Sequence, residues 1–157
     1  MRVLLDIDKD IEEDVIIIKA RTYNKEIEKY YQLLCHTKNN NNNLVLYQNK
    51  KEYLIDYQDI IFFETDEDGI YAHTIKEAYL CKLKLYELEH ILPFSFQRIS
   101  KSAIVNIDHI YSIERNFSSS SLIKFYDSNK EVYVSRKYYK IFKEKMIRQK
   151  LALKNDI

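Results

Sequence analysis

Cationic and hydroxyl side chains gather in two short stretches of the second half of the chain. These stretches are Arg98-Ile99-Ser100-Lys101-Ser102 and Ser135-Arg136-Lys137, the latter followed closely by Lys140. Each lies at the end of an apolar run typical of a strand, where a side chain can leave the core. Lys, Arg and Ser hold phosphate oxygens, and Arg and Lys also bind guanine edges in the major groove. From the residues alone, nucleic-acid binding and simple solubilisation of loop ends explain both stretches equally well.

The distribution of charge also sets the second half of the chain apart. The formal net charge is only +1, yet residues 1–43 carry −1, residues 44–92 carry −5 and residues 93–157 carry +7. Such asymmetry is typical of an electrostatic binding surface within one region. A basic helix face exposed to water is the alternative explanation.

Residue types that often act in catalysis or bind metals also occur in the chain, but their patterns do not match a catalytic or metal site. A single Gly cannot build a phosphate-cradling loop, and the four His residues show no metal-ligand spacing with Cys35 or Cys81. The two Cys are far apart in sequence, which is typical of reduced thiols in the cytosol. The carboxylates from Glu64 to Asp68 do not match a calcium loop and predict a solvated turn. We therefore expect no enzymatic activity, no cofactor and no metal.

The sequence also predicts the compartment. No apolar run approaches the roughly 20 residues that cross a bilayer. The N-terminus, MRVLLDIDKDIEED, is acidic and lacks the apolar region of a secretory signal. We expect a cytoplasmic protein that does not insert into a membrane.

The elements that must position the two basic stretches are mostly short strands, so we predict an α+β fold that is mostly β. Residues 1–8 and 14–20 read as strands, and residues 21–35 as a helix capped by Thr22 or Asn24. A tight turn is expected at Asp66, Asp68 and Gly69, and Pro93 ends a short helix. The remaining predicted strands lie within 43–49, 51–57, 59–69, 69–75, 78–83, 103–110, 110–116, 122–128 and 130–136; an amphipathic helix covers 136–154.

These patterns divide the chain into four parts. Residues 1–37 form a β-β-α lead, 38–43 an Asn-rich linker, 44–150 the main domain and 151–157 a tail. The lead is too short for a robust core of its own. It could form a dimer surface, bind another partner, or cover one end of the main domain.

Three motifs in this order resemble the LytTR DNA-binding domain of bacterial transcription regulators. They are I-x-F-F-E at 60–64, F-x-R-I-S-x-S-x-I-V-N at 96–106 and V-S-R-x-Y at 134–138. The resemblance covers about residues 44–150. It implies an elongated set of small antiparallel sheets with short helices, in which strand-end loops rather than a recognition helix enter successive major grooves.

The resemblance also assigns roles by position. It places Lys101 and Lys137 at base-contacting positions. It places Arg98, Ser102 and Ser135 at phosphate-contacting positions, to which the guanidinium of Arg136 is added. The further residues expected at the DNA are Asp68 and Gly69 of a first loop, together with Ser100, Asn106 and Lys140.

The implied function is that of a stand-alone DNA-binding transcription regulator without a receiver domain. Its implied partners are double-stranded DNA with repeated half-sites and a second copy of the chain. An interaction module that meets an acidic partner or a membrane surface through its basic end is the alternative. Sequence dependence separates the two, because a generic polycation binds scrambled DNA equally well.

Overall fold

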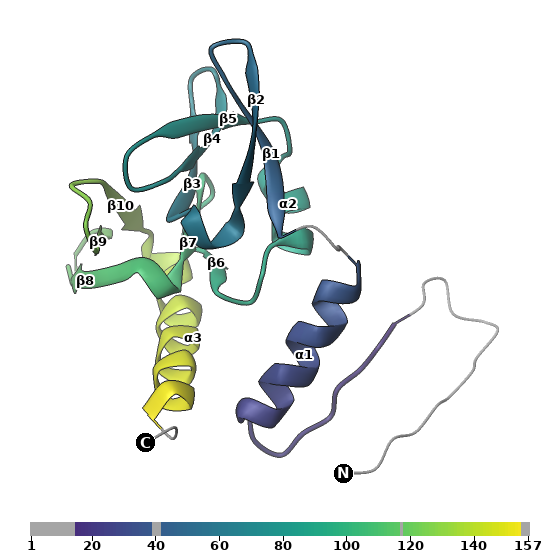
Figure 1. Ribbon diagram of the computed structural model, residues 1–157. Coiled ribbons are helices and arrows are strands. Elements are labelled where there is room, and N and C mark those ends of the chain that lie inside the picture. Colours follow the sequence, from purple (N-terminus) through teal and green to yellow (C-terminus); the bar gives the residue numbers. More distant parts are fainter. Residues whose placement is uncertain (1–14, 39–41, 117, 155–157) are drawn as a thin grey trace.

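The computed structural model describes residues 15–38, 42–116 and 118–154 of the chain. This part holds two antiparallel sheets and the helices α1 (Lys25–Lys38), α2 (Leu85–Ile91) and α3 (Arg136–Lys154) (Figure 1). The mostly β, α+β fold predicted from the sequence is confirmed. Among the described residues, no helix is both long enough and apolar enough to cross a membrane.

The larger sheet has the strand order β2-β1-β5-β4-β3-β7-β6. Its strands are β1 (Asn43–Gln48), β2 (Lys51–Asp56), β3 (Phe62–Asp66), β4 (Gly69–His73), β5 (Ala78–Cys81), β6 (Phe96–Arg98) and β7 (Ala103–Asn106). The smaller sheet has the order β10-β9-β8, with strands β8 (Ile110–Glu114), β9 (Ser121–Phe125) and β10 (Glu131–Val134).

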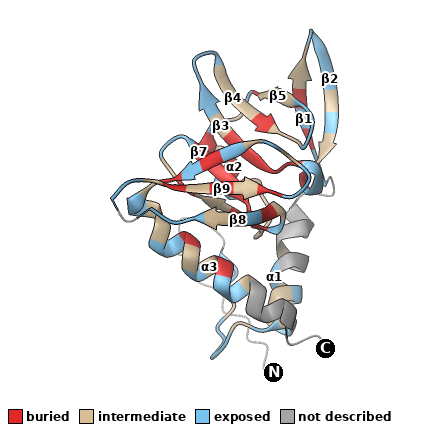
Figure 2. Cartoon of the chain, turned by 90° about the vertical axis from the view of Figure 1, so that its left-hand side faces the viewer, coloured by how far each residue is buried: buried red, intermediate tan, exposed pale blue. Residues whose placement is uncertain are grey.

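Strand β3 supplies both hydrophobic cores because successive side chains of a strand point to opposite faces. Phe62 packs in a core shared with the smaller sheet and α3, where Phe142 is fully buried. Phe63 packs on the other face beneath α2, next to Leu88. The buried residues of Figure 2 accordingly concentrate between the two sheets and their helices.

Phe62 also joins the two sheets directly. Its ring stacks on Phe125 of β9 with centroids 5.2 Å apart, and on His73 of β4 with centroids 4.2 Å apart. Burial lowers the pKa of His73 to about 4, so the imidazole is neutral near pH 7 and packs as an aromatic ring.

The apolar run from Ala103 to Ile110 is not one strand, as its sequence predicted. The 3-10 turn η2 (Ile107–His109) interrupts it, and the chain passes there from the larger to the smaller sheet. Asn106 starts the turn, since its Oδ1 accepts the Asp108 N–H at 3.2 Å. Strand β6 was not predicted.

The lead differs from the prediction more strongly. The predicted strand over 14–20 is wrong, because residues 15–20 form no strand; Val15, Ile16 and Ile17 are 64%, 75% and 70% exposed. A β-branched run forms a strand only where it finds a partner to complete its backbone hydrogen bonds. The strand predicted over 1–8 lies outside the described residues.

The helical part of the lead is confirmed. Asn24 caps α1 by accepting the Ile27 N–H at 3.0 Å on Oδ1, so Asn24 rather than Thr22 is the cap. Helix α1 extends to Lys38 and β1 begins at Asn43, and residues 39–41 of the predicted linker lie outside the described residues.

Helix α1 packs on the connection between α2 and β6. Tyr23 stacks on Phe94 with ring centroids 5.3 Å apart, and Tyr31 meets the same ring edge-on at 5.6 Å. Lys145 of α3 places Nζ 4.3 Å from the centre of the Phe94 ring. Of the three roles left open for the lead, α1 thus covers one end of the main domain.

Candidate nucleic-acid interface

Residues 99–102 form the turn between β6 and β7. The N–H groups of Ile99 and Ser100 donate to the Ala103 carbonyl at 3.0 and 3.4 Å. Ser100 Oγ accepts the Ser102 N–H at 3.0 Å and lies 3.2 Å from Ser102 Oγ. These bonds fold the turn tightly and leave Lys101 exposed at its tip.

The start of α3 is held against this turn. The Ser135 N–H donates to the Ile99 carbonyl at 2.9 Å, and the Ile99 side chain is fully buried beneath it. The Ser135 carbonyl accepts the N–H groups of Tyr138 and Tyr139, both at 3.0 Å, which begins the helix. The cations that follow Ser135 are exposed: Arg136, Lys137 and Lys140.

The β3–β4 hairpin adjoins the same turn from the other side. The Thr65 N–H donates to the Ser102 carbonyl at 2.8 Å. The predicted tight turn is confirmed, because Asp66 pairs with Gly69 across a two-residue loop. Gly69 has φ +147°, and a Cβ there would lie 3.0 Å from a methyl of Leu80, so this position requires glycine.

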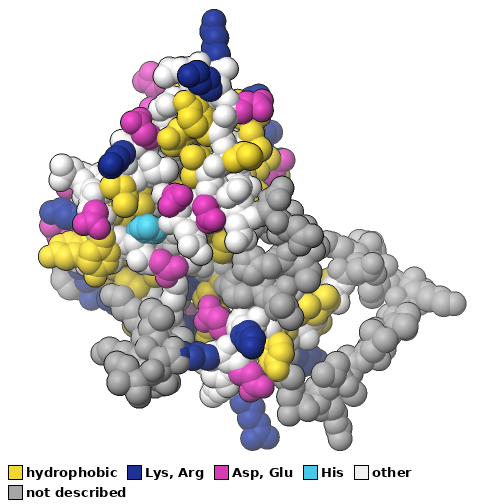
Figure 3. Space-filling view, in the orientation of Figure 1, with side chains coloured by type: hydrophobic (Ala, Val, Ile, Leu, Met, Phe, Trp, Pro, Cys, Tyr) yellow, Lys and Arg dark blue, Asp and Glu magenta, His cyan; other side chains and the backbone are white. Residues whose placement is uncertain are grey.

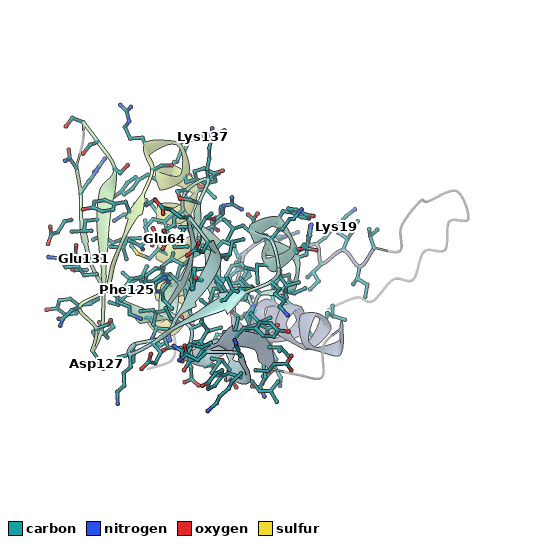
Figure 4. All side chains as sticks on the ribbon, turned by 90° about the horizontal axis from the view of Figure 1, so that it is seen from above. Lys19, Glu64, Phe125, Asp127, Glu131 and Lys137 are labelled. Carbon is teal, nitrogen blue, oxygen red and sulfur yellow. The ribbon has the colours of Figure 1, made fainter. Side chains whose placement is uncertain are left out.

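Backbone hydrogen bonds therefore join three turns that are far apart in sequence. We call the turns 66–69, 99–102 and 135–137 the three-turn surface. In the view from above, Lys137 lies at one end of the fold, whereas Asp127 lies at the opposite end of the smaller sheet (Figure 4).

The electrostatics of the three-turn surface favour a bound anion at α3. The first turn of α3 contains no acidic residue, and its cations lie at the positive end of the helix dipole. Each such cation costs about 0.3–1 kcal/mol of helix stability, which a bound phosphate offsets. The hairpin is acidic instead, and burial together with the charge of Asp66 raises the pKa of Glu64.

Arg98 lies behind the β6–β7 turn, and its side chain is only 16% exposed. Its Nε donates to the Ser100 carbonyl at 2.6 Å, and Nη2 donates to the Lys101 carbonyl. Its Nη1 pairs with Glu89 of α2 at 2.9 Å. All three guanidinium nitrogens thus bond within the chain, an arrangement that holds the turn in place.

Asn106 does not fit the DNA contact expected of it. The residue is only 2% exposed, and its Nδ2 donates to the Ile60 carbonyl at 3.0 Å. Its Oδ1 starts the η2 turn by accepting the Asp108 N–H. Both ends of the amide are used inside the fold, so Asn106 is a structural residue at the junction of the two sheets.

The sequence model of one protein family, the LytTr DNA-binding domain, matches residues 50–147. The chain belongs to the LytTR family. An uncharacterized HTH-type transcriptional regulator of Staphylococcus aureus is 33% identical over 148 residues, which are 93% of this chain and 98% of that relative. A relative of the same description from Staphylococcus aureus strain MW2 is 39% identical over 105 residues, which are 66% of this chain and 69% of that relative.

A solved structure agrees with this LytTR assignment at the level of the fold. The LytTr DNA-binding domain of a Bacillus cereus protein superposes with a TM-score of 0.62 at 24% identity. The match covers 67% of this chain and 96% of that domain.

Sequence reasoning missed two residues that shape the three-turn surface. Glu89 fixes Arg98 from α2, and Thr65 ties the hairpin to the β6–β7 turn. Glu89 lies on α2 and Arg98 on β6, so no short sequence pattern indicates their contact. Thr65 could have been noticed, because it stands at the end of a predicted strand beside a turn.

Proposed function

We propose that this LytTR chain is a sequence-specific DNA-binding transcription regulator that inserts strand-end loops into successive major grooves. The observation that carries the proposal is the three-turn surface, which places Lys101 and Lys137 on two neighbouring turns. Among the described residues, long stretches of strand separate α1, α2 and α3, so no helix-turn-helix pair is available to read a groove.

Within this proposal the residues of the three-turn surface take different roles. Lys101 and Lys137 reach base edges, where Lys donates to guanine acceptors. Ser102, Ser135, Arg136 and Lys140 hold phosphates with the N-terminal N–H groups of α3, and Ser100 shapes its turn. Asp68 and Gly69 form the hairpin loop that approaches the duplex.

The decisive experiment selects bound duplexes from a random pool, using the full chain. A regulator enriches one motif and binds it more tightly than a scrambled duplex by 1,000-fold or more, on the order expected of specific complexes. A pool that stays random would favour the alternative of a basic module for an acidic partner.

Replacing Arg98 tests whether its guanidinium holds a DNA phosphate or instead supports the β6–β7 turn. The in-chain bonds of Arg98 favour support, so Arg98→Ala and Glu89→Gln should both weaken DNA binding while the salt dependence keeps its slope. Lys137→Ala serves as the comparison, because removal of a cation at the DNA lowers the slope by about one unit. Titrations over a range of salt concentrations measure both quantities. A lower slope for Arg98→Ala with a neutral Glu89→Gln would show a phosphate contact instead.

We further propose that the chain binds repeated half-sites as a homodimer, and that residues 44–150 fold independently as the DNA-binding domain. The exposed Val15, Ile16 and Ile17 supply apolar surface for self-association.

Changing these three residues together to Ser should therefore give a monomer. The monomer should bind one half-site normally and the paired site less tightly, because the linked second contact is lost. Sedimentation and half-site titration measure the two effects. Leu54→Ser is the matched control, since Leu54 is 71% exposed on β2. A triple variant that remains dimeric would contradict the proposed surface.

A further inference from the structure

The outer face of the smaller sheet is exposed and rich in tyrosine. Its inner side chains, among them Ile123 and Val132, are buried in the core, so the alternate residues of each strand face outward. The rings of Tyr111 and Tyr126 meet edge-on with centroids 5.2 Å apart. At the left of Figure 3, where the smaller sheet lies, hydrophobic side chains lie beside acidic ones. The tyrosines of this face are 52–64% exposed: Tyr111, Tyr126 and Tyr133.

The charge of this face does not suit DNA. Lys124 bonds to Glu114 of β8 and lies opposite Glu131 of β10, so two carboxylates share one cation. The hydrogen bond to Glu114 and the charges of both carboxylates raise the pKa of Lys124. The face is therefore acidic overall and repels phosphates. Exposed tyrosines with charged residues around them are typical of a protein–protein interface instead.

The outer face of α3 has the opposite character. Residues 137, 140, 141, 144, 147 and 148 are exposed and recur every three or four positions, so they share one side of the helix. Ile141 and Ile147 are 59% and 45% exposed on this side. Lys140 and Arg148 outnumber Glu144 there, which makes the face basic. A basic face with exposed isoleucines complements a tyrosine face with excess carboxylates.

These two faces cannot meet within one chain. The inner face of the smaller sheet and the buried side of α3 belong to the same core, where Ile123, Phe142 and Met146 pack. Their outer faces therefore look away from that core on different sides (Figure 2). We infer that the outer face of the smaller sheet binds the outer face of α3 of a second copy of the chain, so that neighbouring copies associate head to tail.

The size of this contact restricts it to copies that are already on DNA. Three strands of up to five residues, about 4.8 Å apart with a rise of about 3.3 Å per residue, have a footprint of about 240 Å². Stable interfaces bury about 800 Å² per partner. The contact is thus too small to hold a dimer in solution. It rests on the proposed function, because adjacent half-sites supply the high local concentration that a weak contact needs.

Titration of the full chain against duplexes with one or two copies of the selected half-site tests the head-to-tail contact. The two half-sites point in the same direction and lie a whole number of helical turns apart, so that both copies bind one side of the duplex. We expect the second copy to bind about 5–150-fold more tightly than the first, the usual range of coupling between sites. Moving one half-site by about 5 base pairs should abolish this gain, because the copies then lie on opposite sides.

Variants of each face separate this contact from other sources of cooperativity. Tyr111→Ser with Tyr133→Ser changes the sheet face, and Ile141→Gln with Ile147→Gln changes the helix face. Each double variant should lose the gain, while its affinity for one half-site and its sedimentation stay those of the parent. A mixture of the two should recover part of the gain, because one copy supplies an intact helix face and its neighbour an intact sheet face. Tyr86→Ser is the matched control, since Tyr86 is 57% exposed on α2, outside both faces.

The possible outcomes distinguish this contact from the proposed function. Double variants that keep the full gain would overturn the contact, and a mixture that recovers nothing would contradict its head-to-tail arrangement. A parent chain that prefers the half-site but fills two half-sites independently would overturn the contact and leave the proposed function standing. A parent chain that binds the half-site no better than a scrambled duplex would overturn the proposed function, and the contact with it.

Discussion

Replacing Lys101 and Lys137 together by Ala should remove most of the preference of the chain for its selected duplex. Each Lys lies exposed on its own turn, and the Ser135–Ile99 backbone bond holds the two turns together. Loss of a base contact costs on the order of 1–3 kcal/mol, and losses at separate contacts add approximately. The double variant should therefore bind preferred and scrambled duplexes with similar affinities.

Titration of each variant against both duplexes at one salt concentration measures this preference. Lys76→Ala is the matched control, because Lys76 is exposed in the β4–β5 turn, at the opposite end of β4 from the hairpin. It should leave the preference unchanged. Lys137→Arg is the complementary change, since the bidentate guanidinium fork should sharpen discrimination at that base. An equal loss on both duplexes in the single variants would mean that the lysines contact only the backbone.

Local features of this fold could be predicted from the sequence because they depend on neighbouring residues. The Asn24 cap is such a feature, since a side-chain oxygen meets an N–H three residues further on. The hairpin turn at Asp66–Gly69 is another, since its tight geometry needs a glycine. The apolar periodicity of α3, which comprises Tyr138, Ile141, Phe142 and Met146, predicts part of its buried face. Phe142 and Met146 are buried, whereas Ile141 is 59% exposed.

Features that depend on distant partners could not be predicted in the same way. Nothing near Ser135 in sequence indicates that its N–H donates to Ile99, yet this bond brings two basic stretches together. The bonds of Arg98 to Glu89 and to two turn carbonyls likewise join residues that no short sequence pattern links. The run Val15–Ile17 has strand propensity, but the described residues include no strand that pairs with it. Propensity alone is therefore not enough to make this run a strand.

Replacing Phe62 by Ala should destabilise the fold more than any change in the three-turn surface. Phe62 is 2% exposed and stacks between Phe125 of the smaller sheet and His73 of the larger one. Removal of a buried Phe side chain typically costs about 3–5 kcal/mol, because the cavity that remains is only partly filled. Denaturant unfolding followed by circular dichroism measures this loss as a change in the free energy of unfolding.

Phe62→Ala should also disturb the three-turn surface, because Phe62 lies on the strand that leads into the β3–β4 hairpin. The smaller sheet continues from β10 into Ser135 and α3, so weaker packing of the two sheets loosens the three-turn surface. Phe62→Leu keeps most of the buried volume and should retain DNA binding with a smaller loss of stability. Tyr133→Ala is the matched aromatic control, since Tyr133 is 58% exposed on β10 and should change stability by less than about 0.5 kcal/mol. If Phe62→Ala were no more destabilising than Tyr133→Ala, the two sheets would not depend on this contact, and the positions of the three turns would need another support.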